Sequence, residues 1–261
     1  YVYWDKFKYK KLLEDFSSEE LWMCTKFIRR VQSSKSVIKS ESGDYFTCFT
    51  LPGLEEFFHQ IDLNTGGNLF AFAKDMDEKS KYKFISRGIV EEAIASSQLE
   101  GANTTRKLAK KFLQEGRKPR NEAERMILNN YQTMKAIEEE HRNKQMDIDL
   151  IFELHSMIIK NTVPKGEQGR FRRDEDNIVV SDQKYIYHIP PKIRFVEDQM
   201  QDFIKFANDS LGEAFIHPVI KAIMLHFWIG YLHPFTNGNG RLARLIFYWY
   251  LSSLMLWNNN Y

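Results

Sequence analysis

The residues best suited to chemistry lie together between positions 233 and 244, in the run His-Pro-Phe-Thr-Asn-Gly-Asn-Gly-Arg-Leu-Ala-Arg. Helix-period apolar residues precede this run and follow it, so we expect a tight Gly/Asn loop between two helices. Free backbone N–H groups at a helix start, together with the helix dipole, favour a bound anion. The 233–244 segment therefore predicts a site for a negatively charged group such as a phosphate.

Individual side chains in this segment strengthen the prediction. Gly238 and Gly240 let the backbone approach an anion closely, because they have no Cβ. Arg241 and Arg244 are three residues apart and so share a face of the second helix, where two guanidinium groups can bind phosphate oxygens. His233 precedes the loop, and imidazole is the side chain best suited to accept a proton near neutral pH.

The 233–244 segment resembles the signature of Fic-domain proteins, His-Pro-Phe-x-(Asp/Glu)-Gly-Asn-Gly-Arg-x-x-Arg, and matches every fixed position except Asn237. The resemblance implies a protein adenylyltransferase, which moves the AMP portion of ATP to a Ser, Thr or Tyr hydroxyl of a target protein, with Mg²⁺ present. In that reaction His233 would be the catalytic base. The nucleotide would be bound by Gly238, Asn239, Gly240, Arg241 and Arg244.

Asn237 stands where the family usually carries an acid that holds Mg²⁺. The neutral amide oxygen of Asn237 is a poorer ligand than a carboxylate, so we expect a weakened dependence on Mg²⁺. This departure leaves three functions open: an active adenylyltransferase, an enzyme that uses another phosphate-containing substrate or removes AMP, and a nucleotide-binding regulator with little turnover. The intact His233, Arg241 and Arg244 favour the first. A P-loop enzyme is excluded, since its glycine-lysine motif is absent from the sequence.

Residues 86–101 predict an amphipathic helix with Ser86 as its N-cap and Gly101 as its stop. A solvated terminal acid is one interpretation of Glu100, but a carboxylate in the last turn opposes the helix dipole unless it has a cationic partner. Ser96-x-x-x-Glu100-Gly101 also resembles the inhibitory motif of autoinhibited Fic proteins. That resemblance implies that Glu100 pairs with Arg244 and takes this cation from the γ-phosphate of ATP.

Residues 177–188 predict a β-hairpin in an otherwise helical sequence, because two β-forming runs flank a polar segment that can turn. The hairpin could be plain scaffold. The Fic resemblance instead implies a flap, which lies over the active site and holds an extended target segment by edge-strand pairing. The residues expected to dock the target are Ile178, Val179, Val180, Tyr185, Ile186 and Tyr187.

Helical periodicity dominates the remaining sequence. One apolar stripe is expected to face the core from the helix that precedes the loop: Ile220, Ile223, Met224, Phe227 and Tyr231. The helix over 241–257 is apolar on nearly all sides, which predicts a central position. We therefore expect a mainly α fold, a Fic-type helical bundle with one β-hairpin flap built around helix 241–257. We assign 1–84 to an N-terminal helical or irregular region packed on the core, and 85–261 to the Fic domain.

Bulk properties limit the remaining choices. The chain has 261 residues, 43% of them hydrophobic, and a formal net charge of +2, which is no clustered basic excess of the kind that nucleic-acid binding needs. Cys24 and Cys48 have no metal-ligand spacing and indicate a reducing compartment. No apolar run could span a membrane and no signal peptide is visible, so we expect a cytoplasmic protein. ATP and a target protein are the expected partners, with self-modification and a homodimer left open.

Overall fold

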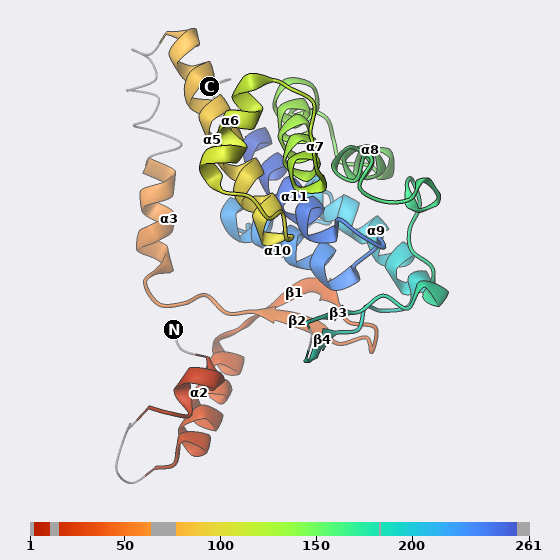
Figure 1. Cartoon of the computed structure of the whole chain (residues 1–261). Coiled ribbons are helices and arrows are strands. Elements are labelled where there is room, and N and C mark those ends of the chain that lie inside the picture. Colours follow the sequence, from red (N-terminus) through yellow and green to blue (C-terminus); the bar gives the residue numbers. More distant parts are fainter. Residues whose placement is uncertain (1–2, 11–15, 64–76, 183, 255–261) are drawn as a thin grey trace. The chain divides into compact units, whose positions relative to one another are not determined.

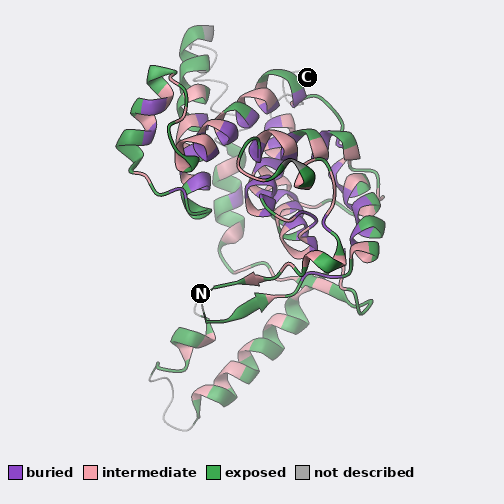
Figure 2. Cartoon of the chain, turned by 45° about the vertical axis from the view of Figure 1, so that its right-hand side comes forward, coloured by how far each residue is buried: buried purple, intermediate pink, exposed green. Residues whose placement is uncertain are grey.

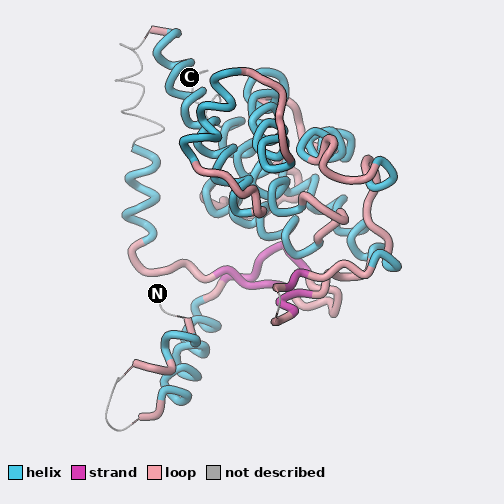
Figure 3. The backbone as a smooth tube through the Cα atoms, viewed as in Figure 1, coloured by secondary structure: helices cyan, strands magenta, loops and turns pink. Residues whose placement is uncertain are grey.

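Helices make up most of the structure, and short strands occur in two places (Figures 1 and 3). This computed structural model describes residues 3–10, 16–63, 77–182 and 184–254. Each of the two sheets is a two-stranded antiparallel hairpin. The predicted mainly helical fold with a hairpin is confirmed, and a further hairpin lies in the N-terminal part of the chain. None of the described helices combines the length and the apolar composition that a bilayer-spanning segment needs.

The chain divides into two compact units, residues 1–59 and 60–261. The first holds α1 (Trp4–Phe7), α2 (Ser18–Gln32), β1 (Ser34–Lys39), β2 (Tyr45–Cys48) and most of α3 (Leu54–Asp62). A capping box starts α2, because the Ser17 side chain accepts from the Glu20 N–H while the Glu20 carboxylate accepts from the Ser17 N–H. The expected division between residues 84 and 85 stays a prediction.

The second unit is a helical bundle. Its elements are α5 (Glu78–Leu99), α6 (Arg106–Glu115), α7 (Glu122–Ala136), the π-helical turn η2 (Ile137–His141), α8 (Ile148–Ile158), the 3₁₀ turns η3 (Lys165–Glu167) and η4 (Asp174–Asp176), β3 (Val180–Ser181), β4 (Ile186–His188), α9 (Ile193–Ala207), α10 (Pro218–Leu232) and α11 (Asn239–Leu254). Buried residues concentrate in this bundle (Figure 2).

Helix α11 packs against α10, α8, α7, η2 and α5, which makes it the centre of the second unit. Leu242, Leu245, Ile246 and Trp249 are all buried on it. Burial of such side chains typically stabilises a fold by about 1.5–3 kcal/mol each. The predicted helix 241–257 is therefore central as expected, but it begins two residues earlier, at Asn239, and residues after Leu254 lie outside the described part.

Two expectations for helices in this unit are wrong. Helix α5 does not begin at Ser86: Asp77 is its N-cap, with Asp77 Oδ1 3.1 Å from the Ser80 nitrogen. On α10, Ile223 and Phe227 are exposed, whereas Lys221 is buried and paired with Asp209 and Glu213. The helix is apolar on most sides, so its periodicity did not identify the buried face.

Helix α5 is held in place by a small apolar core that it shares with α6 and α7. Ile94 on α5 and Ile127 on α7 are fully buried there, and Ala109 joins them from α6. Gly101 ends the helix with φ +92°, a left-handed conformation that suits glycine. The last turn of α5 is thereby fixed beside α11, which brings Ser96 and Glu100 to the start of that helix.

Candidate active site

The α10–α11 turn, residues 233–238, has a tightly defined backbone. His233 ends α10 in the left-handed region with φ +47°, and Gly238 precedes α11 with φ +81°. A Cβ at Gly238 would lie 2.9 Å from Ile159 Cγ2, so a larger residue there would be both strained and crowded. Glycine is thus required at 238 by the packing of the turn against α8.

Asn239 closes this turn with its side chain. Its Oδ1 accepts from the Phe235 N–H at 3.0 Å, and its Nδ2 donates to the Phe235 carbonyl at 2.7 Å. Phe235 itself is fully buried and stacks on His155, with 3.5 Å between the ring centroids. Both amide atoms of Asn239 therefore serve the turn, and what Asn239 can offer an anion is its backbone N–H at the start of α11.

His155 on α8 also supports the turn. Its Nε2 donates to the Asn237 carbonyl at 2.9 Å, which leaves Nδ1 as a buried atom with no hydrogen-bond partner among the described residues. Burial lowers the pKa of His155 to about 4, opposed by the bond to Asn237 and assisted by the nearby Arg241 charge. A neutral imidazole thus sits beneath the loop near neutral pH.

Arg172 is a second support that the sequence did not reveal. This buried side chain donates from Nε to the His233 carbonyl at 2.8 Å and from Nη2 to the Pro191 carbonyl. Its backbone N–H also bonds the Pro234 carbonyl at 2.9 Å. The sequence showed only a basic, turn-rich stretch near residue 170, and nothing local in it links Arg172 to a segment some sixty residues later.

His233 has the geometry of a proton acceptor. Its Nδ1 is 3.3 Å from the Gly230 carbonyl, an acceptor, so the neutral ring carries its proton on Nδ1. The Nε2 lone pair has no hydrogen-bond partner among the described residues. Burial lowers the pKa of His233, which the bond to Gly230 opposes, and the neighbouring His188 and Arg172 lower it further. The imidazole is consequently neutral at physiological pH and can take up a proton through Nε2.

Arg241 is buried, in contrast to a surface cation. Its Nη1 donates to the Ile158 carbonyl at 2.9 Å, and its Nη2 lies 3.2 Å from Asn237 Oδ1. Burial lowers its pKa, and its Nε has no hydrogen-bond partner in the described part of the chain. The site thus contains a fixed guanidinium whose charge is incompletely compensated, which favours a neighbouring anion.

Arg244 contacts the last turn of α5 through three hydrogen bonds. Its Nε donates to Ser96 Oγ at 2.7 Å, and its Nη2 donates to the Ser96 carbonyl at 3.1 Å and to Glu100 Oε1 at 2.7 Å. The ion pair between Arg244 and Glu100 is half-buried. The structure therefore brings together three of the predicted site residues, although 144 positions separate the acid from the guanidinium.

The Glu100 carboxylate also lies directly over the start of α11. A Cβ built at Gly240 would be only 2.3 Å from Glu100 Oε1, so this approach requires glycine at position 240. The N-terminal turn of α11 favours negative charge because its N–H groups have no partner within the helix. Glu100 thus stands where the sequence predicted a phosphate, and it contacts Arg244 at the same time.

The residues at this loop do not fit a protein-held Mg²⁺. Asn237 Oδ1, the oxygen that would be the ligand, accepts from the Arg241 guanidinium. The Glu167 carboxylate, which contacts the turn, accepts from the Thr236 hydroxyl at 2.8 Å. No group of three or more His, Cys, Asp or Glu side chains suited to a metal occurs among the described residues. The described residues of the loop therefore offer Mg²⁺ no free carboxylate ligand.

The hairpin is shorter than the predicted 177–188. Its strands pair Val180 with His188 and Ser181 with Ile186, while Asn177 adopts a left-handed conformation that ends η4. The His188 ring bonds the Tyr231 carbonyl at 2.7 Å, which ties the second strand to the end of α10. The apolar residues named for docking are largely exposed on it: Val179, Tyr185, Ile186 and Tyr187. Ile178 and Val180 are half-buried.

The sequence of this chain is similar to that of a known protein family. Residues 145–251 match the model of the Fic/DOC family. A "Protein adenylyltransferase Fic" from Nematostella vectensis is 36% identical over 108 residues, which are 40% of this chain and 22% of that protein. "Protein adenylyltransferase fic-1" from Caenorhabditis elegans is 33% identical over 103 residues, 39% of this chain and 18% of that protein. The chain thus spans about a fifth of the length of these curated relatives.

Solved structures show the same fold at lower identity. A Fic domain containing signaling protein from Bacteroides thetaiotaomicron has a TM-score of 0.63 and 18% identity, covering 76% of this chain and 72% of that one. Fic-1 from Caenorhabditis elegans has a TM-score of 0.60 and 19% identity, covering 78% and 60%.

Proposed function

We propose, because residues 145–251 match the model of the Fic/DOC family, that this chain contains a Fic domain and is a protein adenylyltransferase that Glu100 inhibits. The observation that carries this proposal is the position of the Glu100 carboxylate. It accepts a hydrogen bond from Arg244 and approaches Gly240 closely, at the loop that also contains His233. The curated relatives named as protein adenylyltransferases support the reaction, although each aligns over only part of its length.

In the proposed transfer of AMP from ATP, each group in the loop has one role. The target hydroxyl oxygen attacks the α-phosphorus of ATP and forms a new P–O bond, while the bond to the bridging oxygen of the β-phosphate breaks and pyrophosphate leaves. The hydroxyl proton passes to Nε2 of the neutral His233. The first N–H groups of α11 and the buried Arg241 stabilise charge on the α- and β-phosphates, and Arg244 contacts the γ-phosphate.

Inhibition follows from the position of one carboxylate. Glu100 occupies Arg244, the cation proposed for the γ-phosphate, and repels the phosphates from the start of α11 at Gly240. A nucleotide that binds must displace Glu100, or adopt a pose in which its α-phosphorus is out of line with the target hydroxyl. Removal of the carboxylate therefore takes the competing negative charge from both Arg244 and the helix start, while Arg244 keeps its bonds to Ser96.

The flap contributes the binding of the target. Ile186 and Tyr187 are 61% and 66% exposed, and the two short strands leave backbone groups along their outer edges. We propose that an extended target segment pairs with this hairpin and presents its hydroxyl to His233.

A nucleotide-binding regulator with little turnover is the alternative that Asn237 favours, because its side chain faces Arg241 and offers no carboxylate to a metal. Transfer of label separates the two functions. The Glu100→Gly variant is incubated with ATP labelled at either the α- or the γ-phosphate, and label on protein is measured. We expect label from the α-phosphate alone, absent in Glu100→Gly/His233→Ala. Label from the γ-phosphate would indicate a kinase, and nucleotide binding with no label at all would favour the regulator.

A further inference from the structure

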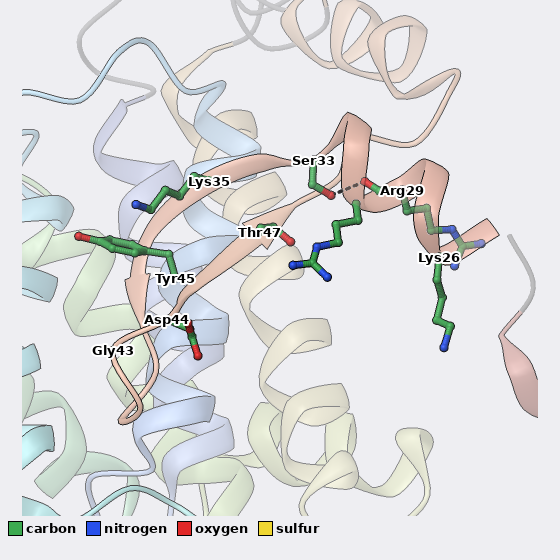
Figure 4. A pocket seen from close by; sticks show the side chains of 9 residues that line it. Lys26, Arg29, Ser33, Lys35, Gly43, Asp44, Tyr45 and Thr47 are labelled. Carbon is green, nitrogen blue, oxygen red and sulfur yellow. Dashed lines mark hydrogen bonds between the residues drawn. The ribbon is translucent and has the colours of Figure 1, made fainter. Parts of the chain in front are cut away.

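A wide hollow lies between α2 and the β1–β2 hairpin, within the N-terminal unit (Figure 4). Its volume is about 1030 Å³, slightly above the roughly 300–1,000 Å³ of most small-molecule sites. Ser33, Gly43 and Thr47 line it, and the Ser33 hydroxyl donates to the Arg29 carbonyl at 2.6 Å. Four cationic side chains and one carboxylate, Asp44, also line it: Lys26, Arg29, Arg30 and Lys35.

The cations of α2 are gathered on one face. Lys26, Arg29 and Arg30 have the spacing i, i+3 and i+4, so they are neighbours on the helix surface, where like charges repel. The helix dipole stabilises cations near a helix C-terminus, which explains the presence of Arg29 and Arg30 there. It does not account for Lys35, which reaches the same hollow from β1.

Three of these four charges are only weakly compensated. Lys26, Arg30 and Lys35 form no ion pair with a carboxylate within the described residues, and the Lys35 ammonium lies 3.7 Å from the centre of the Tyr45 ring. Figure 4 shows Lys26 and Arg29 on the helix side of the hollow and Lys35 above Tyr45 on the hairpin side. The single acid, Asp44, already accepts from the Ser42 hydroxyl at 3.0 Å in the turn of the hairpin. Cations therefore reach the hollow from both elements.

The charges around the hollow favour a small anion as its ligand and not a long polyanion such as a nucleic acid. Residues 1–59 carry as many acidic as basic side chains, so this unit lacks the overall basic field that draws nucleic acid. Glu19 and Glu20 in the first turn of α2 confine the positive charge to the other end of that helix. We propose that the hollow is a second anion site, which binds a small molecule carrying several phosphate groups, either a nucleotide or an inorganic polyphosphate.

The test uses the full chain labelled with ¹⁵N and titrated with inorganic tripolyphosphate, and in a second arm with ATP. The Arg244→Gln background weakens binding at the α11 loop, so the amides of Gly43 and Thr47 report the hollow alone. We expect saturable shifts at these amides, which weaken as salt rises. Lys35→Gln and Arg30→Gln should each weaken binding roughly threefold, as for an exposed ion pair.

Lys39→Gln is the matched control, because Lys39 belongs to the same strand but lies outside the lining of the hollow. It should leave the affinity unchanged. Equal binding of both ligands assigns recognition to the phosphates, and tighter binding of ATP assigns it to a nucleotide; either supports the site. No shift at Gly43 and Thr47, an equal loss in Lys39→Gln, or tighter binding of a single-stranded oligonucleotide at these amides would overturn the proposal. None of these outcomes depends on adenylyl transfer.

Discussion

The two sides of the candidate active site are held in different ways. The α10–α11 turn is fixed by the core: Asn239 bonds Phe235 twice, and Arg172 and His155 hold its carbonyls from other elements. The α5 side contacts α11 through the half-buried, solvent-accessible side chains at Arg244 and through Glu100, which lies over Gly240. The α10–α11 turn is held rigidly, whereas single substitutions can remove the contact between Glu100 and Arg244. The two sides can therefore be perturbed independently.

The largest expected effect on the rate of adenylyl transfer comes from the α10–α11 turn. His233→Ala should lower adenylyl transfer by roughly 10²–10⁴-fold, the usual contribution of a general base. The measurement is the rate of α-phosphate label transfer in the Glu100→Gly background. Because the His233 pKa is lowered, the rate with His233 present should fall only below neutral pH, as the imidazole becomes protonated. A rate in the alanine variant within twofold of its parent would remove His233 from the chemistry.

Low pH should lower the free energy of unfolding through His155, which supports the α10–α11 turn. The unfolded chain protonates this imidazole near pH 6.5 and the folded chain near pH 4, so the unfolded state binds more protons between these values. The free energy of unfolding should therefore fall by about 3 kcal/mol from this residue as pH drops from 7 to 4. Urea unfolding at several pH values measures it.

His155→Gln is the comparison for this prediction, because its amide can still donate to the Asn237 carbonyl but does not titrate. His233 and His226 also have lowered pKa values and remain in both proteins. The difference between the two pH profiles thus isolates His155. Parallel profiles would contradict the assignment.

A smaller effect is expected on the removable side from Ser96→Ala. The change deletes the bond from Arg244 Nε to Ser96 Oγ but leaves the Ser96 carbonyl and Glu100 in contact with Arg244. We expect a gain in transfer rate of roughly threefold. Ser97→Ala is the matched control, because the Ser97 hydroxyl bonds the Ala93 carbonyl on the same helix and does not touch Arg244.

The smallest expected effect concerns metal. Asn237→Asp places a carboxylate at a position that now offers only an amide oxygen, and carboxylates are the ligands that Mg²⁺ prefers. The Mg²⁺ concentration for half-maximal transfer should fall, measured in the Glu100→Gly background. An unchanged metal requirement and rate would show that position 237 does not limit metal use.

The loop was predictable because its signal is local. Glycine, asparagine and arginine at fixed spacing between two apolar helices indicate an anion site without any knowledge of the fold. The proximity of Glu100 and Arg244 was different: no periodicity links two residues so far apart in the chain, and only the family resemblance suggested it. Contacts of Arg172 and His155 with the loop are tertiary, and no short pattern encodes them.

Errors in the helices have physical causes of the same kind. The first turns of α5 are exposed, and their large apolar residues, Tyr82, Phe84 and Ile85, form no buried stripe, so the cap at Asp77 was not recognised. On α10 nearly every side is apolar, and the buried Lys221 is stabilised by Asp209 and Glu213 from another segment. Periodicity identifies a buried face only where the opposite face is polar.

The account depends most on the contact between Glu100 and Arg244, and one rate ratio tests it directly. Transfer of α-phosphate label is measured for the unaltered chain and for Glu100→Gly, with Glu91→Gln as a control on the same helix, because Glu91 pairs with Arg106 and Lys110 instead. Loss of a charged hydrogen bond of this kind should raise the rate roughly tenfold or more in Glu100→Gly alone. Equal rates in all three proteins would contradict inhibition by Glu100.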